Sequence, residues 1–247
     1  MSSVRFGLRR MTTMALCVVL LVCALAVAVG AGAWQWPAQL TLGGFIVTGV
    51  SGSIRADGSG TANGVLRIPG LGSPAISLTR SAAGEISGTL NISAKPAGVE
   101  FQGGFVLENA GLKGRGTVRT SPRQVVDASI SINPSGQASG AGVVQLGGLI
   151  VPAKVNFSQN SCGISGSAPT RAEADTPLAA YEFNGNLDLG LSGTKITVTA
   201  RGAVRRTGKL ANQVTTQDVS NVPVDPSDGQ GKVNVGGVNV VFDFFGS

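Results

Sequence analysis

Histidine, the side chain that most often carries proton transfer and metal binding, is missing from all 247 residues of this sequence. Without an imidazole the chain cannot build a Ser-His-Asp or Cys-His relay, or a histidine-based pH switch. Catalysis by two carboxylates needs a converging pair, and the 13 acidic residues are scattered so that the sequence pairs none of them. We therefore expect that the protein is not an enzyme.

Sequence motifs for bound metals and phosphates do not occur either. The stretch from Asp225 to Gly229 comes nearest to a calcium-binding loop, but it is too short and contains Pro226. No glycine-rich phosphate loop stands between a strand and a helix. The sequence therefore predicts neither a metal nor a cofactor.

Cys162 is the only cysteine after residue 33, since Cys17 and Cys23 both lie earlier in the chain. A disulfide within residues 34–247 is therefore impossible. Two interpretations of Cys162 stay open: a small buried apolar side chain, or a free thiol able to pair with a partner. Neither makes it a catalytic nucleophile, because no base is available to activate it.

Basic residues gather in two stretches, one with Lys113, Arg115 and Arg119, the other with Arg201 and Arg205. One interpretation is an edge strand whose charges prevent further strand pairing. The other is contact with anionic lipid headgroups or with an acidic partner. Nucleic acid is not expected, because no aromatic residues that could stack on bases are interleaved with these cations.

The N-terminal part of the chain predicts export. Residues 1–10 form a basic tail, and the stretch from Met11 to Ala33 carries no charge and is long enough to cross about 30 Å of hydrocarbon as a helix. Basic residues favour the cytoplasmic side, and Trp34 and Trp36 suit the opposite membrane–water interface. We expect residues 11–33 to be a transmembrane signal anchor. A cleavable signal peptide with a small-residue site at residues 31–33 or 26–28 is the alternative.

The rest of the chain, residues 34–247, alternates apolar and polar residues with a period of two. Ile86 to Ala94 is one clear example, and Leu149 to Ser158 is another. Such alternation is typical of antiparallel strands with one apolar face and one solvent-exposed face. The turn signals between these strands predict a meander of roughly 11 to 14 strands. We expect one all-β domain that forms a curved groove, an open barrel or a sandwich, with loops at residues 168–180 and 216–231.

Glycine often interrupts this pattern. The chain has 37 glycines, about twice the usual share of roughly 7%. Several glycines, including Gly88, Gly114 and Gly116, fall on the apolar side of predicted strands. Glycine inside a strand often marks a bulge or a tight bend. The pattern therefore predicts a strongly curved sheet whose apolar face is loosely filled.

The layout resembles the AsmA/TamB-like envelope proteins, in which one N-terminal membrane helix precedes a long meander of glycine-punctuated strands. The stretches that carry the resemblance are Gly49 to Ile54 and Glu85 to Leu90. It implies a taco-like β-groove that shields lipid acyl chains. The chain is also similar in size and layout to the type II secretion system protein N, although the W-x-G string of that family is missing.

Two functions follow as expectations. The first is an inner-membrane protein with its N-terminus in the cytoplasm and its β-domain in the periplasm, where the groove binds or transfers lipid or another apolar ligand. The second is an accessory component of a secretion system or envelope scaffold that docks partner proteins through a sheet edge. The apolar residues expected to contact a ligand, unless they only fill a closed core, are Phe101, Phe105, Val155, Phe157, Leu187, Leu189, Val198 and Phe242.

Overall fold

The computed structural model describes residues 34–120 and 125–246. The predicted cytoplasmic tail (residues 1–10) and membrane segment (residues 11–33) lie outside the described residues. Within the described ranges, no helix is both long and apolar enough to cross a membrane.

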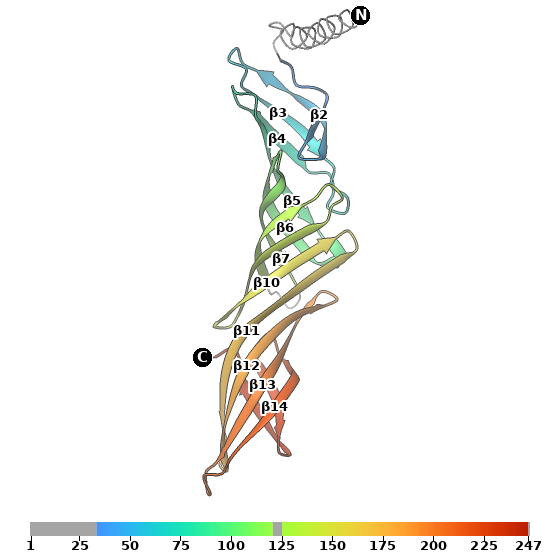
Figure 1. The fold of residues 1–247 in the computed structure, drawn as a ribbon. Helices are drawn as coiled ribbons and strands as arrows, with labels where there is room; N and C mark the ends of the chain where they lie inside the picture. The colour runs from blue at the N-terminus through green and yellow to red at the C-terminus, as the bar shows by residue number, and fades with distance from the viewer. Residues whose placement is uncertain (1–33, 121–124, 247) are drawn as a thin grey trace, which may run out of the picture.

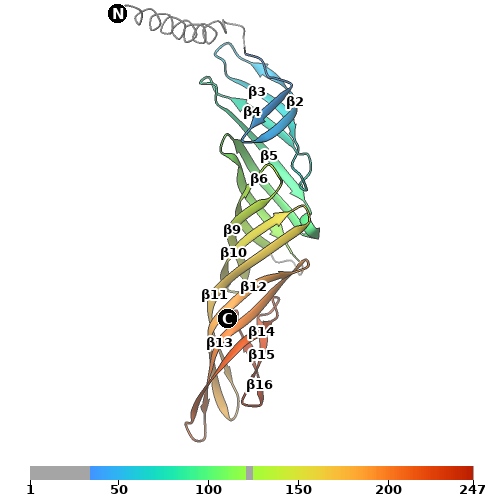
Figure 2. The same ribbon diagram turned by 45° about the vertical axis from the view of Figure 1, so that its right-hand side comes forward.

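One antiparallel sheet of 16 strands makes up the domain, and each strand pairs with its neighbours in sequence from β1 to β16. The sheet curls into an elongated half-barrel (Figures 1 and 2). The first half consists of β1 (Gln39–Leu42), β2 (Phe45–Ile54), β3 (Gly60–Leu66), β4 (Ala75–Arg80), β5 (Ile86–Ala94), β6 (Glu100–Glu108), β7 (Gly111–Arg119) and β8 (Val125–Ile132). The second half consists of β9 (Ala138–Leu146), β10 (Leu149–Ser158), β11 (Ser161–Asp175), β12 (Ala179–Ser192), β13 (Lys195–Gly208), β14 (Val214–Val224), β15 (Gln230–Val235) and β16 (Val238–Asp243).

The predicted all-β antiparallel meander is confirmed, but the expected number of strands was too low. The alternation of the sequence sets the two faces: along β10, the apolar residues from Val151 to Phe157 are buried on the concave side, and Lys154 and Asn156 are exposed on the convex side. A single 3₁₀ turn, η1 (Pro96–Gly98), joins β5 to β6.

The two predicted long loops are wrong, because most of their residues belong to strands. β11 runs through Pro169, which pairs with Asn186 of β12. Proline has no N–H to donate but fits an extended backbone wherever that side of the strand needs no ladder bond. β10 pairs with β11 only as far as Gly166, so Pro169 lies beyond the end of that ladder. Likewise β14 covers most of residues 216–231 and leaves only a short turn before β15.

Glycines on the concave side let neighbouring strands approach closely, as the predicted curvature requires. Gly185 of β12 faces Gly202 of β13, and a Cβ on Gly185 would lie 2.2 Å from the carbonyl oxygen of Arg201. The predicted loose filling is wrong, because the aliphatic and aromatic residues of the concave face form one buried cluster that runs from Leu42 to Phe245. Glycine here provides curvature, and the larger side chains fill the space that the curvature encloses.

The half-barrel is closed along its length by turns rather than by paired strands. Turns from one long edge of the sheet contact turns from the other edge that lie several strands further along. The contacts, which we call the turn seam, join Gly43 to Glu108, Gly136 to Pro69, Gly70 to Gln159, and Gly147 to Phe245. Each of these glycines has a positive φ, and a Cβ on Gly136 would lie 2.0 Å from the carbonyl oxygen of Pro69.

At the C-terminal end, the hairpin of β15 and β16 folds back over the concave face. β14 and β15 share a single pair, Val224 with Gly231. The Thr170 hydroxyl of β11 donates to the carbonyl oxygen of Phe244 at 2.8 Å, just after β16. This end of the molecule therefore has two layers, with β11 to β14 on one side and the hairpin on the other.

Candidate functional sites

The eight apolar residues that the sequence singles out all lie on the concave face, and each exposes 6% or less of its surface. The structure brings them into the same cluster. Leu189 and Val198 are direct partners across β12 and β13. In this conformation the face is occupied by its own side chains, so an acyl chain has room there only if the two walls part.

Aromatic rings link distant strands across this interior. Phe101 of β6 lies 4.6 Å from Phe157 of β10, measured between ring centroids, and 5.8 Å from Phe105. Such separations fall within the range of favourable aromatic pairs. The rings therefore hold the two walls of the curl together.

A second aromatic group, near the C-terminus, includes two residues that the candidate set omits. The ring of Phe183 on β12 lies 5.0 Å from that of Phe244 and 6.3 Å from that of Phe242 on β16. The alternation that ends the chain places Phe242 and Phe244 on one face and was the signal available for Phe244. Nothing in the sequence indicates that this face meets Phe183, because that contact depends on the fold-back of the last hairpin.

The basic residues lie on the convex face and are exposed: Lys113, Arg115 and Arg119 on β7, and Arg201 and Arg205 on β13. The two groups are six strands apart in the sheet, so they do not form one surface site. The interpretation as a protected edge strand is wrong, because β7 and β13 each pair on both sides.

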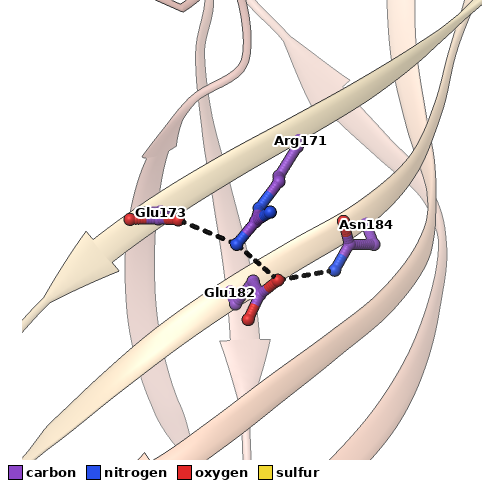
Figure 3. A network of polar contacts seen from close by, with 4 residues as sticks. All are labelled: Arg171, Glu173, Glu182 and Asn184. Atoms are coloured by element: carbon purple, nitrogen blue, oxygen red, sulfur yellow. Dashed lines mark hydrogen bonds and ion pairs between the residues drawn. The ribbon is translucent and has the colours of Figure 1, made fainter.

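A polar network lies on the convex face where β11 and β12 run side by side (Figure 3). The Arg171 guanidinium contacts Glu182 at 2.9 Å and Glu173 at 3.2 Å, and the Asn184 amide donates to Glu182 at 3.0 Å. The two carboxylates share the Arg171 cation, so the network links β11 to β12. Exposed pairs of this kind contribute about 0.2–1 kcal/mol each.

Asp188 makes the stability of the fold weakly dependent on pH. Partial burial raises the pKa of its carboxyl, but hydrogen bonds with Ser167 and Arg201, together with the guanidinium charge, outweigh it and hold that pKa below its ordinary value. A lowered pKa stabilises the fold above the unfolded value of about 3.9, and this contribution is lost as the pH falls through the folded pKa.

We expect Asp188→Asn to lower the free energy of unfolding at pH 7 by about 0.5 kcal/mol or less, because the 2.5 Å pair with Arg201 is largely solvated. The difference from the wild type should be smaller at pH 2, because the native carboxyl takes up a proton as the pH falls. Urea unfolding at the two pH values measures this, and an equal difference at both would show that the charge of Asp188 has no part in it.

Cys162 is half-buried and faces Phe157 across β10 and β11. Burial raises the pKa of its thiol, so it stays protonated and poorly nucleophilic at neutral pH. It borders an open hollow of about 630 Å³ that is lined mostly by small polar residues such as Ser139 and Ser161. A second open hollow, of about 870 Å³, lies where β14 turns into β15 and is bordered by Lys195 and Asp225.

Between residues 34 and 246, apart from 121–124, no three His, Cys, Asp or Glu side chains gather closely enough to hold a metal ion. No family model, no curated protein and no solved structure matches this chain. The candidate sites are therefore the concave apolar face, the convex basic groups, and the edges and ends of the sheet.

Proposed function

We propose that the chain is a bacterial envelope protein, anchored in the inner membrane by residues 11–33, whose periplasmic half-barrel is a scaffold that docks a partner protein. The filled interior supports a scaffold over a container, since its side chains pack on one another. In the part of the chain that the structure describes, the observation that carries the proposal is a free strand edge on β14.

The edge of β14 that points away from β13 has almost no backbone ladder, and only the Gln217 side chain bridges it to Asn234 and Gly236 of the last hairpin among the hydrogen bonds of the described residues. β14 pairs with β13 from Val214 to Val224, but its ladder with β15 consists of the one pair at Val224. From Val214 to Asp218 the side chains of both faces are exposed. An unprotected strand edge can accept a further strand, whose backbone supplies affinity while alternate side chains supply specificity. The partner we propose is therefore an extended segment of another protein.

A photo-crosslinking amino acid at Thr216 tests this docking mode in cells that contain the full chain. Thr216 is exposed at the free edge, and Ser129 is also exposed but lies on β8, which pairs on both sides. We expect a discrete crosslinked protein from position 216 and none from position 129. The same product from both positions, or no product from position 216, would contradict docking at this edge.

A lipid carrier is the second candidate, and the turn seam favours it. The apolar cluster is continuous along the half-barrel, and its two walls meet through turns instead of through a hydrogen-bonded ladder. Parting such turns breaks few backbone hydrogen bonds, so an acyl chain could replace side chains against the apolar face, worth about 25 cal/mol for each Å² of apolar area covered. The resemblance to AsmA/TamB-like proteins supports the same candidate.

Native mass spectrometry of the full chain, released from membranes in mild detergent, distinguishes the two candidates. A lipid carrier should retain phospholipid masses that resist detergent exchange. A scaffold should appear as the bare chain or as the chain with a protein partner.

A further inference from the structure

The last hairpin, formed by β15 and β16, pairs with β14 at one residue and then leaves the ladder. That pair joins Val224 to Gly231, and the next residue of β14 is Pro223, which has no N–H to donate to a further ladder bond. Asn221 has a positive φ of 54°, and the register of β13 with β14 shifts at the same level. Such a shift bends a strand. The neighbouring edges of β14 and β15 are therefore split apart.

Backbone donors and acceptors of β14 point into this split, which we define as residues 214–223 of β14 and 232–235 of β15. The Gly208 N–H donates to the carbonyl oxygen of Gln213 at 2.9 Å, at the start of the ladder with β13. Because bonded and non-bonded pairs alternate along an antiparallel ladder, Val214, Thr216 and Asp218 direct their N–H and C=O groups away from β13. Among the described residues, none of the three has a ladder partner on that side.

The facing edge of β15 offers groups of the same kind. The two-residue turn at residues 236 and 237 makes Val235 and Val238 a hydrogen-bonded pair. By the same alternation, Lys232 and Asn234 direct their backbone groups away from β16 and toward β14. An extended segment between the two strands would bond to both of them, whereas a segment added to an ordinary edge bonds to one strand.

Gln217 bridges the split with its side chain. Its amide donates to the carbonyl oxygen of Asn234 at 3.0 Å and accepts a hydrogen bond from the Gly236 N–H at 3.2 Å. One primary amide thus satisfies a donor and an acceptor of the hairpin, with the chemistry of a peptide group. The base of the hairpin is held separately, by the bond from Thr170 to Phe244 and by aromatic packing. Gln217 can therefore release the tip while the base stays in place.

Side chains around the split indicate which segment would fit. Val222, Val233 and Val235 are buried on the concave side, whereas Thr216 and Lys232 are exposed on the convex side. Successive residues of an inserted strand would face these two environments in turn. The matching segment has small apolar residues at every second position and polar residues between them.

We propose that Gln217 is a latch, and that the extended segment of a partner protein displaces it and pairs with β14 on one side and β15 on the other. The inference rests on the proposed docking at the β14 edge and adds how that site opens and what it selects. The segment spans about eight residues, the length of β14 from Thr216 to Pro223. Latch and segment compete, because the amide of Gln217 occupies backbone groups that the segment would bind.

A second photo-crosslinking position tests insertion in cells that contain the full chain. Lys232 is exposed on the β15 side of the split, so an inserted segment should give the same product from position 232 as from position 216. A product from 216 alone would overturn insertion and leave docking at the β14 edge intact. No product from either position would overturn both. A product with twice the mass of the chain would identify a second copy and overturn the assignment to another protein.

The latch is tested by Gln217→Ala in the chain that carries the photo-crosslinker at position 232. Losing the two bonds removes a competitor, and the crosslinked fraction should rise about fivefold while the partner is limiting, which corresponds to about 1 kcal/mol. Gln217→Glu, which fills the same volume but cannot donate to Asn234, should raise it as well. An unchanged or smaller fraction in both variants would overturn the latch.

The matched control is Gln102→Ala, at an exposed glutamine of β6, a strand that pairs on both sides. It should leave the crosslinked fraction unchanged, and circular dichroism should show all variants folded. An equal rise in the control would mean that the effect does not come from the two bonds of Gln217, and it would overturn the latch.

Discussion

Replacing Phe183 with alanine is expected to lower the free energy of unfolding by about 3–5 kcal/mol. Phe183 is fully buried on the concave face, and its ring contacts those of Phe242 and Phe244, which belong to the folded-back C-terminal end. Truncation leaves a cavity and releases the last hairpin from β12. Urea unfolding of the full chain in a fixed detergent, followed by circular dichroism, measures the loss.

The control for Phe183 is Ile150→Ala, at a side chain that is mostly exposed. A surface substitution of this kind changes stability by no more than about 0.5 kcal/mol. If Phe183→Ala costs no more than the control while bound lipid is lost, the concave face is a ligand surface and not a structural core. The comparison therefore tests the scaffold and the lipid carrier against each other.

Closing the turn seam depends on the absence of a side chain at Gly136, so Gly136→Ala is expected to lower the free energy of unfolding by about 2–5 kcal/mol. Part of this arises from the positive φ of +80° at that residue, at about 1–2 kcal/mol for a left-handed backbone. The rest arises because the new Cβ meets the Pro69 backbone, and overpacking of this kind costs about 1–3 kcal/mol.

Gly193→Ala separates these two contributions. Gly193 has a similarly positive φ of +58°, but nothing lies within 4 Å of the place where its Cβ would be. Thermal unfolding of both variants should show a loss for Gly193→Ala that reflects backbone strain alone. Equal losses at the two glycines would mean that the contact between Gly136 and Pro69 does not hold the half-barrel closed.

Strand identity could be predicted because it depends on local periodicity. The stretch from Ile86 to Ala94 alternates so regularly that its buried face follows directly from the pleat of a strand. The strand count was underestimated where prolines interrupted the pattern, as at Pro169 and Pro223. Their effect depends on whether the adjacent strand still pairs at that level, which is a property of the assembled sheet.

Closure of the curl could not be predicted, because it depends on contacts between residues far apart in the chain. The pairing of Phe101 with Phe157 requires the sheet to bend by a specific amount between β6 and β10. Glycines on the apolar side indicate bending, but they do not specify which turns meet. The same limit explains why the interior was expected to be loose when its residues are in fact buried.

The candidate surface sites were predicted unevenly. The basic stretches are exposed as expected, yet their place in the middle of the sheet could not be inferred, because every strand has a similar pattern. The sequence could not predict that the exposed residues Leu178 and Leu210 lie in adjacent turns, since each is a single leucine among turn residues. Only the hydrogen bond that joins their two turns makes them neighbours.

The unbroken strand order, in which each strand pairs with the one before it, also determines how the domain can be assembled. Each newly formed hairpin finds the preceding strand already in place, and every step closes a short loop at a small cost in chain entropy. The sheet can thus grow one strand at a time from β1 before the rest of the chain has folded. The locking step must come last, because the bond between Thr170 and Phe244 joins residues 74 positions apart and needs the final hairpin.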